Sequence, residues 1–296
     1  MRWKGLRRSG NVDDRRGAGA PGGRGGGVRL PVSGKGGLGL VVVLVIAYFV
    51  LGPELVVSLL AGGGSSVESG VAASREPAGS DGATPNDEAG AFAAAMLGST
   101  EDVWEAQFSE QGQRYVAPTL VLFSDAVDSA CGYNTAATGP FYCPPDRQLY
   151  IDLSFFATLA RMGGPGDFAQ AYVIGHEVGH HIQNLLGTAR DVRARQQRLD
   201  QAGANRLQVA MELQADCLAG VWAHHANQQQ PLLEPGDVDE GLAAAAAIGD
   251  DTLQRNAGRR VTPEAFTHGS AAQRQEWLKR GLSTGDVSQC DTFSVI

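Results

Sequence analysis

The sequence predicts an α+β domain, mostly helical with a small sheet, that follows a single N-terminal transmembrane helix. Three observations support this fold class. Much of the second half of the chain has helical spacing of apolar residues, only two short stretches are typical of strands, and one long apolar stretch lies near the N-terminus. A chain of 296 residues with 43% hydrophobic composition is long enough to bury a sizeable core.

The first 36 residues are rich in glycine and arginine and contain few large apolar side chains. This composition predicts a disordered basic cytoplasmic segment over residues 1–36. Nine basic and two acidic residues lie in residues 1–37, whereas the whole chain has a net charge of −8. The acidic remainder disfavours nucleic acid as a partner. We interpret the basic head as a topology signal rather than as a binding site for RNA or anionic lipid.

An apolar stretch runs from Leu38 to Leu60, and it predicts a transmembrane anchor over residues 37–61. A helix rises about 1.5 Å per residue, so this length suffices to cross a hydrocarbon core of roughly 30 Å. A cleaved signal peptide is the alternative, but its charged leader would be unusually long and no clear cleavage site lies near Ala61. The basic residues before the anchor predict a single-pass protein of the cell membrane, with a cytoplasmic N-terminus and an extracytoplasmic domain after the anchor.

Residues 62–90 are small and polar, which predicts a flexible linker before a folded domain over residues 91–296. Within this domain the spacing of apolar residues and the positions of Gly and Ser predict the following elements. They are helices over 91–108, 167–186, 191–201, 205–226 and 237–248, strands over 119–124 and 148–155, and a last helix from a capping box at Ser270 to Arg280.

A motif for metal chemistry lies in the helix predicted over 167–186, where the chain reads His176-Glu177-Val178-Gly179-His180. Positions i and i+4 share one face of a helix, so His176 and His180 can bind one metal ion. Glu177 is rotated away from that position and can reach a water molecule on the metal instead. Two imidazoles at this spacing predict a Zn2+ site with Glu177 as the general base.

A carboxylate from a second helix completes the predicted ligand set. Glu212 and Asp216 lie one turn apart in the helix predicted over 205–226, and apolar residues flank both. We predict Glu212 as the third zinc ligand and Asp216 as the partner that orients a ligand histidine through its second ring nitrogen. The alternative is an exposed acidic stripe.

Four cysteines, Cys131, Cys143, Cys217 and Cys290, lie in the part of the chain predicted to be exported. An even number in an oxidising compartment predicts two disulfides, for which three pairings are possible. Local geometry favours Cys131 with Cys143 around a short loop that contains glycine and proline, which leaves Cys217 to pair with Cys290. A zinc site made of these cysteines is disfavoured, because no C-x-x-C pair exists.

Nearly the whole chain resembles the bacterial family of putative neutral zinc metallopeptidases. The resemblance rests on segments that read MRWKG, NVDDRRG, CGYNTAATGPFYCPPDRQLYIDLSFF, VIGHEVGHHIQNLLG, MELQADCLAGVW and FTHGSAAQR. It implies a zincin fold. The Glu-x-x-Ala-Asp element also resembles the third-ligand helix of gluzincins such as thermolysin, which implies the ligand role for Glu212 and orientation of His176 by Asp216. Gluzincins often stabilise the oxyanion with a His or Tyr, so the resemblance implies His268 as a catalytic candidate; a plain loop histidine is the alternative.

These features together predict a membrane-anchored zinc peptidase that acts on a peptide or protein substrate. The strand over 148–155 is expected to pair with an extended peptide at a sheet edge. The alternative function is a zinc-containing, non-catalytic domain of the cell envelope that binds peptides or proteins. A serine or cysteine hydrolase is disfavoured, because G-x-S-x-G is absent and the cysteines are expected to be paired.

Overall fold

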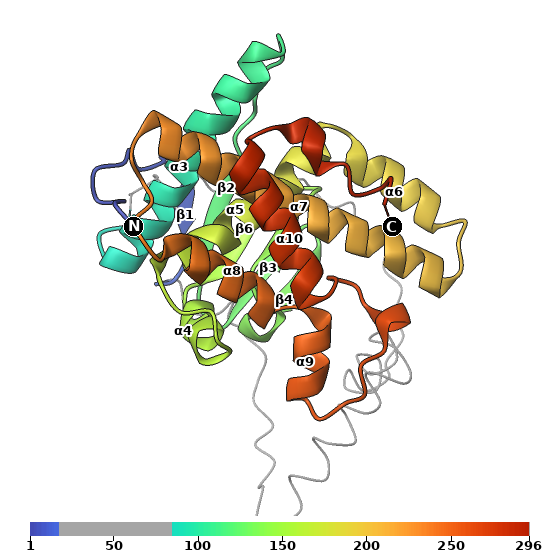
Figure 1. The fold of residues 1–296 in the computed structure, drawn as a ribbon. Coiled ribbons are helices and arrows are strands. Elements are labelled where there is room, and N and C mark those ends of the chain that lie inside the picture. The colour runs from blue at the N-terminus through green and yellow to red at the C-terminus, as the bar shows by residue number, and fades with distance from the viewer. Residues whose placement is uncertain (18–84, 296) are drawn as a thin grey trace, which may run out of the picture. The chain divides into compact units, whose positions relative to one another are not determined.

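The computed structural model describes residues 1–17 and 85–295, which form a layer of helices and two small sheets (Figure 1). The helices are α3 (Glu88–Glu110), α4 (Ser154–Arg161), α5 (Asp167–Leu185), α6 (Thr188–Gln196), α7 (Gln201–Gln229), α8 (Asp237–Ala247), α9 (Asp250–Asn256) and α10 (Ala271–Thr284), with 3-10 turns η1 (Ala136–Thr138), η2 (Pro263–Ala265) and η3 (Val287–Cys290). The strands are β1 (Val12–Asp14), β2 (Thr119–Phe123), β3 (Ala126–Ser129), β4 (Gly132–Thr135), β5 (Phe141–Cys143) and β6 (Gln148–Asp152).

The ends of α3 and α10 are set by side chains that cap the helix. The Asp87 carboxylate accepts a hydrogen bond from the Gly90 amide, so α3 begins before residue 90, where the predicted linker was expected to end. The rest of that linker, residues 62–84, lies outside the described residues. Ser270 and Gln273 form the predicted capping box at the start of α10.

The larger sheet has the strand order β1-β2-β6-β5, with β1, β2 and β6 parallel and β5 antiparallel. Successive side chains of a strand point to opposite faces, and here both faces are covered. One face joins the main core beneath the helices, and the other packs against the β3–β4 hairpin. The first face contains Leu120, Leu122, Leu149 and Ile151, and the second contains Val121, Phe123 and Tyr150 together with Val127 and Cys143.

The N-terminal segment corrects one prediction. Residues 1–17 are not disordered, because β1 pairs with β2 and places Val12 opposite Leu120. Arg7 forms ion pairs with Glu101 and Asp102 of α3. The basic composition is therefore matched by acidic side chains of the domain, and an edge strand held by backbone hydrogen bonds needs few apolar residues of its own. Residues 18–36 lie outside the described residues.

For the described residues, the predicted fold class needs one correction, which concerns its transmembrane helix. Among the helices that the structure describes, none is long and apolar enough to cross a bilayer. The anchor expected over residues 37–61 lies outside the described residues. The described chain is instead a mixed helical domain with two small sheets.

Helix α7 lies at the centre of the helical layer and packs against both α5 and α10 (Figure 1). Glycines permit these close contacts. A Cβ atom on Gly175 of α5 would lie 2.7 Å from the ring of Trp222 on α7, and a Cβ atom on Gly281 of α10 would collide with the backbone of Cys217. The disulfide between Cys217 and Cys290 ties α7 to η3, directly after α10. These features fix the helix that carries Glu212 and Asp216 between its two neighbours.

Candidate metal centre

The two helices that carry the predicted ligands meet at a small contact. Gly179, between the two histidines of α5, faces Ala215 of α7, and a Cβ atom on Gly179 would lie 2.9 Å from the Ala215 carbonyl oxygen. Only hydrogen in place of a side chain permits this approach. It brings Glu212, one turn before Asp216, within reach of the α5 imidazoles.

The structure brings His176, His180 and Glu212 together, although 36 residues separate His176 from Glu212. The Glu212 Oε2 atom lies 3.2 Å from His176 Nε2 and 3.6 Å from His180 Nε2. One ligand atom from each residue lies within 4.8 Å of the others. Tetrahedral zinc with bonds of 2.0–2.1 Å places neighbouring ligand atoms roughly 3.3 Å apart. The donor atoms and their spacing therefore fit a zinc ion.

Both ligand histidines are oriented by a hydrogen bond at the other ring nitrogen. His176 Nδ1 lies 2.8 Å from Asp216 Oδ1, the contact expected from the sequence. His180 Nδ1 lies 2.9 Å from Gln183 Oε1, and the Gln183 amide group in turn donates to the carbonyl oxygen of Met211. Each Nδ1 atom thus carries the proton, and each Nε2 atom is left to face the metal position.

Two supporting glutamines are absent from the sequence-based prediction. Gln183 is buried and lies three residues after His180, on the same helix face. Gln208 lies one turn before Glu212 and donates a hydrogen bond of 2.9 Å to its Oε1 atom, which leaves Oε2 toward the imidazoles. The i+3 and i+4 spacing was the available signal, but glutamine at that spacing is common on helices.

The charges around His176, His180 and Glu212 favour the binding of a cation. Burial acts to lower the pKa of His176, but the carboxylates of Asp216 and Glu212 outweigh it and raise this pKa to about 9. Burial likewise opposes the charged form of His180, and Glu212 raises its pKa above the ordinary value. Burial alone would raise the pKa of Glu212, yet the two imidazoles hold it well below its usual range. A divalent cation held by neutral imidazoles would meet the same favourable field.

The group lies in the wall of a cleft of about 550 Å³. Glu177 also lines this cleft, and its side chain forms no hydrogen bond or ion pair with another residue in the described part of the chain. The lining also includes Tyr142 of β5 and Val192 of α6. A substrate in the cleft would therefore contact the metal ligands and Glu177 together.

His268 lies at the same cleft, in the loop before α10. Its Nδ1 atom lies 3.3 Å from Asp250 Oδ1, and the backbone amides of Thr267, His268 and Gly269 all donate to Asp250 Oδ2. The hydrogen bond to Asp250 raises the pKa of His268 above its ordinary value. Asp250 therefore holds the loop and the imidazole in one arrangement.

His181 and a second group of carboxylates are not part of the candidate metal centre. His181 is buried between the Tyr142 hydroxyl and the carbonyl oxygen of Val116, and burial lowers its pKa to about 4. A further set of carboxylates lies within ligand distance of one another, formed by Asp167, Asp237 and Glu240. The Met1 ammonium group lies 2.8 Å from Asp167 and 3.4 Å from Asp237 and supplies the compensating positive charge.

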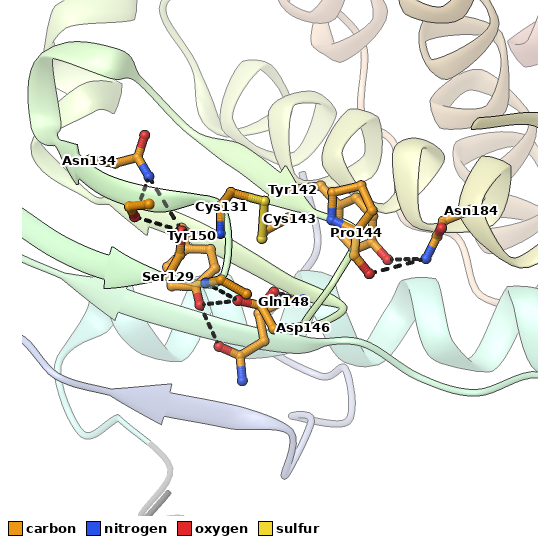
Figure 2. Close-up of a disulfide and its surroundings, with 12 residues drawn as sticks. Ser129, Cys131, Asn134, Tyr142, Cys143, Pro144, Asp146, Gln148, Tyr150 and Asn184 are labelled. Carbon is orange, nitrogen blue, oxygen red and sulfur yellow. Dashed lines mark hydrogen bonds between the residues drawn. A yellow bond between two sulfur atoms is a disulfide. The ribbon is translucent and has the colours of Figure 1, made fainter. Parts of the chain in front are cut away.

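The two predicted disulfides, Cys131–Cys143 and Cys217–Cys290, are both present. The first lies at the end of β5, as Figure 2 shows. Next to it, the Tyr142 hydroxyl accepts a hydrogen bond of 2.9 Å from Asn184, one turn after His180 on α5 (Figure 2). The disulfide ties β5 to the β3–β4 hairpin, and the hydrogen bond from Asn184 ties it to the helix that carries His176 and His180.

The edge available for a peptide differs from the predicted one. Residues 148–152 form β6, which lies between β2 and β5, so both of its edges are already paired. The expectation that this strand binds a substrate is therefore wrong, and α4 replaces its predicted end from Ser154 onward. Among the described residues, the edge strands of this sheet are β1 and β5, and of these two β5 contributes Phe141 and Tyr142 to the cleft.

Comparison with known proteins assigns the chain to a family. Residues 1–293 match the family described as "Putative neutral zinc metallopeptidase". The chain belongs to this family. The family description implies zinc, in agreement with the His and Glu group at the cleft.

Relatives of the chain occur in distant bacteria. "Uncharacterized protein YpfJ" of Escherichia coli (strain K12) is 48% identical over 295 residues, which cover 99% of each chain. "Uncharacterized protein Rv2575" of Mycobacterium tuberculosis (strain ATCC 25618 / H37Rv) is 48% identical over 191 residues, which cover 61% of this chain and 64% of that protein. No solved structure matches the chain.

Proposed function

We propose that this chain is a zinc-dependent peptidase that hydrolyses peptide bonds by means of an activated water molecule. The observation that supports the proposal most strongly is the group of His176, His180 and Glu212, whose ligand atoms lie within 4.8 Å of one another at a cleft. Two imidazoles and one carboxylate beside an open position are the donor set of catalytic zinc sites. Zinc bound there would supply a Lewis acid that polarises a carbonyl group and lowers the pKa of water.

Glu177 is the proposed general base. It lies next to a ligand histidine, lines the cleft and has no hydrogen-bond partner among the described residues that would hold it away from a substrate. Its carboxylate accepts a proton from the attacking water and then delivers that proton to the departing amine. Glu177 has no purpose in a purely structural site, where all ligand positions are closed.

His268 is the proposed donor to the carbonyl oxygen of the scissile bond. Its Nδ1 atom faces Asp250, so the other ring nitrogen is left to donate a hydrogen bond into the cleft. A donor already held in place stabilises the negative charge that develops on this oxygen. The raised pKa of His268 favours the protonated form that this role needs.

An extended peptide is the proposed substrate, bound along the free edge of β5. Backbone groups on this edge can add one further strand to the sheet. The hydrogen bond from Asn184 to Tyr142 connects this strand to α5, and the disulfide Cys131–Cys143 connects it to the β3–β4 hairpin. A non-catalytic, zinc-containing domain that binds peptides would use the same edge, so turnover separates the two functions.

The test is the full-length Glu177→Gln variant, with the exposed Glu110→Gln as its matched control. Glu177→Gln should keep its zinc, measured by elemental analysis, and lose hydrolysis of a peptide library by about a hundredfold or more. Glu110→Gln should match the parent in both. Full activity in Glu177→Gln would remove this residue from the mechanism, and a zinc-loaded parent without chelator-sensitive turnover would favour the binding domain.

A further inference from the structure

A buried arginine contacts Asp216, the residue that orients His176. Arg274 of α10 is almost fully buried, and its Nε and Nη2 atoms each lie 2.9 Å from an oxygen atom of Asp216. The Tyr172 hydroxyl donates to the same carboxylate at 2.6 Å, and His176 Nδ1 lies 2.8 Å from it. Asp216 is therefore enclosed by four donor contacts from three other residues.

The geometry of this contact is specific to arginine. A planar guanidinium that donates two parallel hydrogen bonds fixes the plane of a carboxylate as well as its charge. With Asp216 held in this plane, its Oδ1 atom stays aligned with His176 Nδ1. The orientation of the His176 ring then follows, because its Nδ1 atom has a fixed partner.

The position of Arg274 is set by packing between α7 and α10. Gly281 and Gly220 lie where the two helix backbones come closest, and the disulfide from Cys217 to Cys290 begins at the residue after Asp216. The distance between Arg274 and Asp216 is therefore held by backbone packing and by a covalent bond, rather than by the ion pair alone.

We infer that Arg274 is a positioning residue of the metal centre, which acts through Asp216 to hold His176 ready for the metal. This inference rests on the proposed zinc site. A positioning role of this kind is worth about 10–100-fold in metal affinity. If the effect passes through Asp216, removal of both residues should cost no more affinity than removal of Asp216 alone.

The experiment measures Zn2+ affinity of the full-length chain by competition with a chromophoric chelator, beside thermal melting of the metal-free protein. The variants are Arg274→Gln, Arg274→Lys, Asp216→Asn and the double variant Arg274→Gln with Asp216→Asn. The control is Arg280→Gln, which removes a more exposed arginine of the same helix that pairs with Glu276. The double variant leaves no unpaired buried charge, so it keeps the test valid if Arg274→Gln alone fails to fold.

We expect Asp216→Asn and the double variant to lose Zn2+ affinity equally, by about 10–100-fold, and Arg280→Gln to match the parent. Arg274→Lys should not restore affinity, because an ammonium group lacks the planar fork. Additive losses, or a folded Arg274→Gln with the affinity of the parent, would overturn the inference. A parent that binds no Zn2+ would instead refute the proposed function on which it rests.

A separate observation concerns the N-terminal segment, residues 1–17. Glu101 of α3 is buried, and every hydrogen bond to its carboxylate within the described residues comes from this segment, from Arg7, Ser9 and Asn11. Gly98, one turn earlier, leaves the space that the Arg7 backbone occupies. Removal of the segment would take away all of these hydrogen bonds to Glu101 together.

The same segment completes the sheet. The register of β1 on β2 pairs Val12 with Leu120 and Asp14 with Leu122. Past the end of β1, Arg16 Nη1 lies 3.1 Å from Asp87 Oδ1, so the segment also contacts the start of α3. Strands that share backbone hydrogen bonds lie on the same side of any membrane.

We therefore infer that residues 1–17 and residues 85–295 occupy one compartment, so that a single membrane crossing between them does not occur. The test places one cysteine on each part of the full-length chain, at the exposed positions Arg8→Cys and Ser109→Cys, because the four native cysteines are bonded in disulfides. Intact and permeabilised cells are treated with a membrane-impermeant maleimide. We expect both cysteines to react under the same condition. Reaction of one in intact cells and of the other only after permeabilisation would refute the inference.

Discussion

The contact between Gly179 and Ala215 makes a quantitative prediction for the substitution Gly179→Ala. The new Cβ atom would lie 2.9 Å from the Ala215 carbonyl oxygen and 3.0 Å from its Cα atom, where ordinary contact begins at 3.4 Å. Backbone atoms of one helix cannot rotate aside, so α7 must move by about 0.5 Å to reach normal contact distances. Ala215 lies between Glu212 and Asp216, and both carboxylates move with it.

The displacement is large for a metal site. It would lengthen the distance from Glu212 Oε2 to His180 Nε2, now 3.6 Å, and so move it further from the roughly 3.3 Å that zinc prefers. Metal sites tolerate deviations of about 0.2 Å in each bond, so we expect Zn2+ affinity to fall by at least about tenfold. The free energy of unfolding should fall by about 0–2 kcal/mol, because overpacking costs about 1–3 kcal/mol and the higher helix propensity of alanine offsets about 1 kcal/mol of it.

The assay compares Zn2+ affinity and chemical denaturation of Gly179→Ala with those of Gly10→Ala, where a Cβ atom meets nothing within 4 Å. The control should match the parent in affinity. If Gly179→Ala folds and binds Zn2+ as tightly as the parent, the argument that this glycine sets the spacing of the ligands is wrong.

Three further predictions concern other parts of the site. Asp250 raises the pKa of His268, so the imidazolium persists to higher pH; in Asp250→Asn the alkaline fall of kcat/KM should shift to lower pH, and an unchanged profile would exclude His268 as the donor. Because this folded-state pKa is raised, the pair stabilises the fold below the ordinary histidine pKa of about 6.5 and loses that effect as pH rises through the raised value. Serine at both Cys217 and Cys290, which are 73 residues apart, should lower the free energy of unfolding by about 4 kcal/mol, and serine at both Cys131 and Cys143, 12 residues apart, by about 3 kcal/mol. Chelation of zinc present at about a thousandfold over its Kd should lower the free energy of unfolding by about 4 kcal/mol, and an unchanged Tm would show that no metal is bound.

Much of the metal centre follows from spacing within single helices. His176 and His180 share a helix face through their i, i+4 spacing, and Glu212 and Asp216 do so in the same way. Local spacing does not show what meets a face from a distant helix. Arg274 is therefore absent from the sequence-based prediction, although it lies in the FTHGSAAQR segment that carried the family resemblance. Its partner Asp216 lies 58 residues away.

Hydropathy patterns predict the strands of the sheet less well than they predict the helices of the metal centre. Strands β1 and β5 have only three residues each, so neither has the alternation that marks a strand. Composition alone predicted disorder for the N-terminal segment, and this was wrong. The hydrogen bonds that stabilise the segment come from residues about 90 positions later, such as Glu101, and composition does not show such contacts. The two strands that the sequence did mark, β2 and β6, both lie inside the sheet, which is why the peptide edge was wrongly assigned to β6.

The pairing of β1 with β2 has a practical consequence for producing the protein. A chain truncated to start at Ala91 retains every predicted metal ligand, yet it exposes one whole edge of β2, an apolar strand of sequence TLVLF. Open apolar edges recruit strands from other molecules. Such a fragment should therefore self-associate, and synthetic peptide spanning residues 1–17, supplied in excess, should suppress that aggregation.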